Sequence, residues 1–145
     1  MEKIYKVVVD YSKSLAETIK AGKYGWVDDY ITTKGFELQG AGQHEVELVL
    51  VDLDRDAITT EVREYMKEQG LEPAKIEHLL AFGATNPELQ RQFPIVALGS
   101  SFVRGNGYRR CPTLGSDDGK RELSLYWDDN DDRWDDDCRF LAVGK

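Results

Sequence analysis

The sequence has few of the residues that usually build metal centres and catalytic dyads. Its 145 residues include two histidines, His44 and His78, and two cysteines, Cys111 and Cys138. The histidines are isolated, so no spacing typical of a zinc site is present, and neither lies near a cysteine as a base for a thiol nucleophile would. Two cysteines are too few for a disulfide scaffold, although a Cys111–Cys138 bridge remains open. We expect no catalytic residue, no metal site and no cofactor.

Long apolar runs and an excess of positive charge are also missing. No stretch approaches the roughly 18 apolar residues that a membrane-spanning helix needs, and the N-terminus lacks the apolar core of a signal peptide. We therefore expect a cytoplasmic protein with no membrane span. The 19 Lys and Arg residues are outnumbered by 27 Asp and Glu residues, which gives a net charge of −8 and a pI near 4.8. A nucleic-acid surface needs clustered positive charge, so we expect no nucleic-acid partner.

The hydrophobic periodicity predicts one α+β domain over residues 1–145. A capping box from Ser14 to Glu17 predicts the start of a helix. Further helices are predicted from Thr59 or Thr60 to Gln69 and from Pro73 to Gly83, with a short turn at Asn86-Pro87. Strands are predicted over residues 4–11, 44–53, 93–98, 122–127 and 139–143.

The predicted layout places the helices in the first two thirds of the chain and antiparallel strands with long loops at the C-terminus. Residues 1–98 form the scaffold with the helices, and residues 99–145 form the ligand-binding part. We expect the first and last strands to pair, Trp26 to Ile31 to form a short turn, and both Gly35 to Gly42 and Ser100 to Gly119 to be loops.

The most unusual segment is the acidic window Asp128 to Asp137, which holds seven aspartates. So many adjacent carboxylates cannot leave water, so a solvated acidic loop is the plainest interpretation. Asp128, Asn130 and Asp132 alternate as at the start of an EF-hand loop, although no glutamate closes the loop as a calcium site requires. A calcium-dependent binding module is therefore the alternative function. Glycoside hydrolysis is disfavoured because the window provides no carboxyl in an apolar pocket.

Arginines and aromatic residues accompany the aspartates after Ser100. Such a mixture is typical of binding surfaces, where aromatics and arginine supply most of the energy and small polar residues adapt. The members are Arg104, Tyr108, Arg109, Arg110, Tyr126, Trp127, Arg133 and Trp134. An ordinary loop-rich surface is the alternative, and so is an enzyme whose motifs are not recognisable.

A spaced set of anchor residues in the last 45 positions carries a family resemblance. The set is Leu98-Gly99-Ser100, Pro112-x-Leu114, Arg121-x-Leu123-x-Leu125, Trp134 and Arg139-Phe140-x-Ala142-Val143. It resembles the C-terminal variable region of the target proteins of diversity-generating retroelements. In that family, error-prone reverse transcription at template adenines changes asparagine codons into codons for Asp, Gly, Ser, Tyr and similar residues. The residues between the anchors here come largely from that set.

The resemblance implies a C-type-lectin-like fold and a non-enzymatic protein that displays a diversified, hypervariable ligand-binding face. The residues expected on that face are Arg104, Asn106, Tyr108, Arg110, Thr113, Ser116, Asp117, Ser124, Tyr126, Asp128, Asn130, Asp131, Trp134, Asp135, Asp136 and Asp137. Tyr108, Tyr126, Trp127 and Trp134 are expected anchors, with Trp127 and Trp134 alternatively part of the scaffold. The ligand, a protein or small molecule, is expected to be basic because the face is acidic. Its identity and the oligomeric state are left open.

Overall fold

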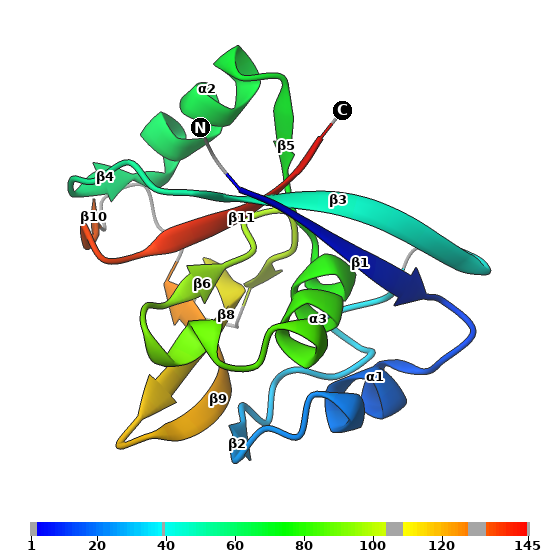
Figure 1. Ribbon diagram of the computed structural model, residues 1–145. Coiled ribbons are helices and arrows are strands. Elements are labelled where there is room, and N and C mark those ends of the chain that lie inside the picture. Colours follow the sequence, from blue (N-terminus) through cyan, green and yellow to red (C-terminus); the bar gives the residue numbers. More distant parts are fainter. Residues whose placement is uncertain (1–2, 39, 104–108, 128–132, 145) are drawn as a thin grey trace.

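The computed structural model describes residues 3–38, 40–103, 109–127 and 133–144 and shows an α+β fold with three α-helices and a large mixed sheet (Figure 1). The elements are β1 (Ile4–Asp10), α1 (Leu15–Ala21), β2 (Trp26–Val27), β3 (Gln43–Val51), β4 (Ala57–Ile58), α2 (Thr59–Glu68), β5 (Leu71–Pro73), α3 (Ile76–Thr85), the 3-10 turn η1 (Leu89–Arg91), β6 (Ile95–Val96), β7 (Phe102–Val103), β8 (Arg109–Asp117), β9 (Lys120–Trp127), β10 (Arg133–Trp134) and β11 (Arg139–Gly144). Among these residues, no helix combines the length and apolar composition needed to cross a bilayer.

Within the described residues the main sheet has the strand order β1-β3-β11-β6-β8-β9-β2, and β5 and β7 add to β11 and β8. The strands β4 and β10 form a separate two-stranded sheet. The expected pairing of the first and last strands is wrong. The strand β3 lies between β1 and β11, because it pairs antiparallel with β1 from Ile4↔Val49 to Asp10↔Gln43 and with β11 on its other side.

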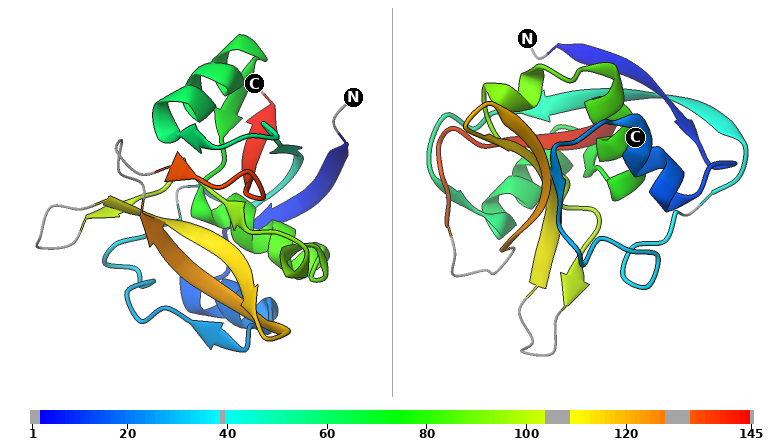
Figure 2. Two further views of the ribbon diagram at one scale, coloured as in Figure 1. Left: turned by 90° about the vertical axis from the view of Figure 1, so that its left-hand side faces the viewer. Right: turned by 90° about the horizontal axis from the view of Figure 1, so that it is seen from below.

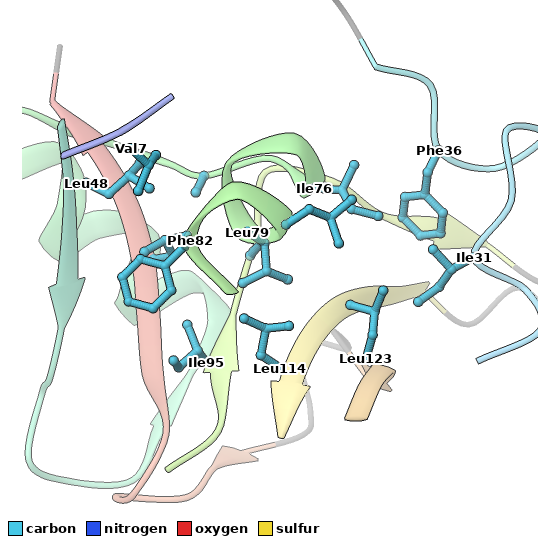
Figure 3. Packing of buried hydrophobic residues seen from close by; sticks show 14 of the residues in the cluster. Val7, Ile31, Phe36, Leu48, Ile76, Leu79, Phe82, Ile95, Leu114 and Leu123 are labelled. Atoms are coloured by element: carbon cyan, nitrogen blue, oxygen red, sulfur yellow. The ribbon is translucent and has the colours of Figure 1, made fainter. Parts of the chain in front are cut away.

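The two faces of the main sheet bury two separate hydrophobic clusters. On one face, Ile76, Leu79 and Phe82 of α3 point toward the strands and pack with residues such as Leu114 and Leu123 (Figure 3). On the other face, Val62 and Met66 of α2 pack with Trp134 and Phe140. Successive residues of β11 alternate between the clusters, as a strand covered on both faces requires. Each fully buried large side chain contributes roughly 1.5–3 kcal/mol.

The predicted helix starts are confirmed for α1 and α2. Ser14 Oγ accepts a hydrogen bond from Glu17 N at 3.1 Å, and Glu17 Oε1 accepts one from Ser14 N at 3.0 Å, which completes the capping box. The helix α2 begins at Thr59 and ends just before Gly70, whose φ of 72° suits a chain reversal after a helix.

The prediction for α3 is wrong at both ends. Pro73 does not open the helix but belongs to β5, where it lies opposite Ala142. Gly83 does not stop the helix, which continues to Thr85. Gly83 has a packing role instead, since a Cβ atom there would lie 2.4 Å from the Tyr24 hydroxyl oxygen.

The segment expected to be a loop from Ser100 to Gly119 contains two strands, β7 and β8. The predicted strand over 122–127 is confirmed but starts at Lys120, and it forms an antiparallel hairpin with β8. Asp118 and Gly119 connect the two strands with φ values of 52° and 80°. Positive φ at both central residues defines the hairpin turn that an Asp-Gly pair favours. The expected turn at Trp26 is instead β2, which pairs parallel with β9.

Candidate functional site

The hairpin strand β9 forms one wall of the candidate site. Leu123 and Leu125 face inward, with exposures of 0% and 7%. Ser124 and Tyr126 face the opposite side, where Tyr126 remains 38% exposed. The alternation follows from the two-residue period of a strand, and on this face Tyr126 is exposed whereas Glu122 and Ser124 are partly buried.

A pocket of about 560 Å³ opens between the end of β9 and the segment 133–138. Its lining consists of Pro94, Leu125, Tyr126, Arg133, Trp134, Asp135, Asp137 and Cys138. The floor is apolar and buried, because Leu125, Trp134 and Cys138 are each no more than 7% exposed. The rim is polar, with Tyr126 on β9 and exposed carboxylates across from it. An apolar floor with a few polar groups at the rim is the usual make-up of a ligand pocket.

Trp134 belongs to the framework of this pocket, so of the two expected roles, anchor or scaffold, its buried position favours the scaffold. Its indole Nε1–H donates a hydrogen bond to Thr59 Oγ1 at 2.9 Å. Its ring meets Phe140 edge to face, with ring centroids 5.7 Å apart. Trp134 also pairs with Ala57 in the two-stranded sheet. The side chain is therefore held by two contacts and the backbone by a third, and Trp134 also lines the pocket.

Arg139 holds the acidic turn that follows Trp134. Its guanidinium donates to the carbonyl oxygen of Asp137 at 2.8 Å, pairs with Asp52 Oδ2 at 3.4 Å, and lies over the ring of Phe93. The backbone of Cys138 closes the turn by donating to Asp135 O at 3.1 Å. The turn is thus fixed through its backbone, while the side chains of Asp135 to Asp137 stay exposed.

The two cysteines in this region do not have the properties of reactive thiols. Cys111 and Cys138 are both buried free thiols, so the possible bridge between them is not formed. Burial, with a contribution from the charges of Asp137 and Asp135, raises the pKa of Cys138 to about 11. A thiol with such a pKa is almost entirely protonated at neutral pH and is a poor nucleophile. Partial burial likewise raises the pKa of Tyr126, and Cys138, Glu122 and Asp137 add to that effect.

The structure brings together Tyr126, Asp135 and Asp137 of the expected site, with Asp136 exposed on the same turn. Ser124 lies two residues before Tyr126 on the same side of β9. Ser116 and Asp117 are exposed beside the hairpin turn, roughly 20 Å away along the strand at about 3.3 Å per residue.

Two other expected members are less exposed than a displayed residue should be. Thr113 is 0% exposed and donates to Cys111 O, so its expected place on a displayed face is wrong. It is buried because both faces of β8 are covered. Arg110 is half-buried on β8. The remaining expected residues, Arg104, Asn106, Tyr108, Asp128, Asn130 and Asp131, lie outside the described residues.

Four pocket residues are not among the residues expected on the displayed face: Pro94, Leu125, Arg133 and Cys138. Arg133 was recognisable as an arginine within the acidic window. Pro94 is far from the window in sequence and is brought there because Arg139 N donates to Pro94 O at 2.8 Å. Among the described residues, no group of three His, Cys, Asp or Glu side chains is placed to hold a metal ion. Asp128, Asn130 and Asp132 of the calcium alternative lie outside those residues.

Comparison with known proteins yields no relative. No protein-family model matches the chain, and no curated protein or solved structure matches it significantly.

Proposed function

We propose that the protein is a non-enzymatic ligand-binding protein of the diversity-generating retroelement type, and that the pocket between β9 and residues 133–138 is the centre of its diversified face. One observation carries this proposal. Around the pocket, most residues of the types that mutation at template adenines produces (the adenine-derived set) are exposed. The fixed residues of the family pattern that lie between them are buried. Tyr126 and Asp135 to Asp137 are exposed, while Leu125 and Trp134 are 7% and 6% exposed.

This separation is what a diversified surface requires. A position can accept many residues only if its side chain does not pack in the core, because core substitutions cost several kcal/mol whereas surface substitutions cost little. The turn at Asp135 to Asp137 meets this condition, since its backbone is held by Arg139 and its side chains are free of the core. Thr113 does not meet it, because it is buried, and we exclude it from the displayed set; Cys111 and Cys138 are buried as well.

The chemistry of the rim favours a basic ligand. Asp135 and Asp137 line the pocket together with Tyr126 and one basic residue, Arg133, and Asp136 is exposed on the same turn. The whole chain carries a net charge of −8. A cationic group can pair with the carboxylates while an aromatic or aliphatic part contacts the apolar floor. Association with such a ligand is expected to weaken as salt rises.

A pair of display libraries tests this proposal. The first varies Ser124, Tyr126, Asp135, Asp136 and Asp137 over the adenine-derived set, and the matched control varies Leu123, Leu125 and Trp134 over the same set. Each library is selected against lysozyme, a basic protein, as the probe. We expect most members of the first library to fold and some to bind, and most members of the control to unfold. A first library that does not fold, or that folds without ever yielding a binder, contradicts the proposal.

Thermal melts separate this proposal from the calcium-dependent alternative. The proposal expects the same melting temperature in EDTA and in added calcium. A calcium site that binds only the folded chain raises the melting temperature in proportion to the logarithm of calcium concentration. A clear rise with calcium would therefore favour the alternative.

We further propose a C-type-lectin-like fold and a cytoplasmic location. The fold assignment is supported by a long hairpin, β8–β9, that carries part of the candidate site. An experimental structure that separates β1 and β11 into different sheets would contradict it. Fractionation of the native host cell tests the location.

A further inference from the structure

The main sheet ends in one long and one short edge. At one end is β2, with two residues, and at the other is β1, with seven. Among the described residues, β3 is the strand that pairs with β1, and the opposite edge of β1 has no partner strand (Figure 2). An unpaired edge of this length is a template for another strand.

The backbone groups on this free edge can be identified from one hydrogen bond. Tyr11 N donates to Gly42 O at 2.9 Å, one position beyond the last pair of the register between β1 and β3. Antiparallel pairs alternate between bonded and non-bonded positions. The odd-numbered residues of β1 therefore bond to β3, and Ile4, Lys6 and Val8 direct their N–H and C=O groups to the free edge.

The edge lacks two of the features that usually block pairing between monomers, a proline and a bulge, and its charge protection is limited to Lys6 and Asp10. The strand contains no proline, and its register with β3 runs without a bulge from Ile4 to Asp10. Ile4 and Val8 are each 55% exposed, and Lys6 between them is the only basic residue of the strand. Natural edge strands are commonly shortened, bulged or charged to prevent association, so this edge is suited to a partner.

A small groove lies beside the C-terminal half of β1. Its volume is about 140 Å³, and it runs between β1 and the helices α1 and α3. Much of its wall is made of small side chains, among them Ala21, Ala81 and Ala84. Small residues at this position allow another chain to approach the edge closely.

The charges of β1 select a second copy of the chain as the occupant. A twofold antiparallel pairing must place edge-facing residues opposite one another, and three such registers pair at least five residues of each β1 strand. One register places Lys6 opposite Lys6 and is disfavoured by like charge. A second places Lys6 opposite Val8 and Asp10 opposite Ile4, which leaves both charges unpaired. The third places Val8 opposite Val8 and Lys6 opposite Asp10, so two ion pairs flank an apolar contact.

We propose that the protein forms a twofold symmetric dimer through the free edges of β1, in this third register. The contact extends the main sheet across the two copies and removes the long unpaired edge from solvent. A closed twofold contact of this kind stops at the dimer and does not propagate into a fibre. The dimer is independent of the ligand-binding proposal, because β1 contributes no residue to the pocket beside β9.

Sedimentation equilibrium of three chains tests the dimer. The wild type is expected to approach twice the 16.5 kDa chain mass as its concentration rises. Val8→Lys places two like charges opposite each other at the axis and is expected to weaken the dimer at least roughly tenfold. Val103→Lys is the matched control, because Val103 is a strand valine with an exposure of 56%, against 55% for Val8. A monomeric wild type, or equal weakening by both variants, overturns the proposal.

Oxidation of a Val8→Cys variant tests the register. Directly opposed residues of a bonded antiparallel pair have Cα atoms about 5.5 Å apart, which lies within the range a disulfide spans. The variant is expected to form a covalent dimer in mild oxidant, and Val103→Cys is expected to remain largely uncrosslinked. The two native cysteines are buried and do not compete. A soluble dimer of the wild type without crosslinking of Val8→Cys would refute this register.

Discussion

Replacing Arg121 with alanine should destabilise the whole domain, although the residue lies outside the candidate pocket. Arg121 is 7% exposed. Its guanidinium donates to Gly22 O at 2.5 Å, to Gly83 O at 3.0 Å and to Gln90 Oε1 at 2.9 Å. It also lies 4.8 Å from the centre of the Tyr24 ring. One side chain of β9 thus joins the ends of α1 and α3 and the turn η1.

The expected loss follows from these contacts. Hydrogen bonds from a charged donor contribute roughly 1.5–3 kcal/mol each, and a buried acceptor left without a partner costs about 1–3 kcal/mol. Because neighbouring contacts are not additive, we expect Arg121→Ala to lower the free energy of unfolding by about 3–5 kcal/mol in total, comparable with breaking a buried pair. For a chain of this size that is a fall in melting temperature of roughly 10 °C or more. Arg121→Lys keeps the positive charge but lacks the planar guanidinium, so the free energy of unfolding should decrease less than in Arg121→Ala.

Urea denaturation followed by circular dichroism measures this loss. The matched control is Arg109→Ala, which removes an exposed arginine from the neighbouring strand β8 and should change the free energy of unfolding by no more than about 0.5 kcal/mol. If Arg121→Ala is no more destabilised than this control, the assignment of Arg121 as the link between β9 and the helices is wrong.

Three further predictions concern a helix cap, a buried tyrosine and the thiols. Ser14→Ala removes the acceptor for Glu17 N and should cost about 1 kcal/mol in urea denaturation, while Ser116→Ala, at an exposed strand position, should cost much less. Burial raises the pKa of Tyr24 to about 12 from 10. The folded chain then holds this proton more tightly than the unfolded chain, so this contribution to stability is complete below about pH 10 and falls by roughly 3 kcal/mol in total as the pH rises through 12. Urea denaturation at pH 9 and pH 11 measures this effect: the free energy of unfolding should decrease less between the two pH values in Tyr24→Phe than in the wild type. An equal decrease in both chains would contradict the assignment. Cys111 and Cys138 are buried, and the pKa of Cys138 is raised to about 11. A colorimetric thiol reagent at pH 8 should therefore label both cysteines only when the chain unfolds. Rapid labelling of the native chain would show that the thiols are accessible.

The sequence correctly predicted those helices and strands that are encoded by a pattern within a few neighbouring residues. The capping box at Ser14, the alternation around Leu48 and the helical spacing of Val62 and Met66 are each contained in a few residues, and the structure confirms the elements they predict. The Asp118-Gly119 turn was also readable, because an Asp-Gly pair between two strand-like runs is a strong hairpin signal. It was missed because the composition of the segment favoured a loop.

The remaining features depend on contacts between distant residues. The position of β3 between β1 and β11 could not be predicted, because the sequence of one strand does not determine which other strands it pairs with. Gly83 fits a helix stop in sequence, and only the nearby Tyr24 hydroxyl shows why glycine is needed there. The sequence leaves Trp134 open as either a ligand anchor or part of the scaffold, and its bond to Thr59 Oγ1 favours the scaffold. The acidic turn was recognised as exposed from composition, but its attachment through Arg139 was not.

The most direct test of the diversification proposal is the DNA sequence on either side of the gene. The proposal predicts a near-copy of the last hundred or so bases of the coding sequence, which differs from it only where the copy has adenine, together with a reverse transcriptase gene. The differences should change the codons of exposed residues such as Tyr126 and Asp135 to Asp137, and should spare those of Leu125 and Trp134. Flanking DNA with neither the near-copy nor the reverse transcriptase gene would contradict the proposal.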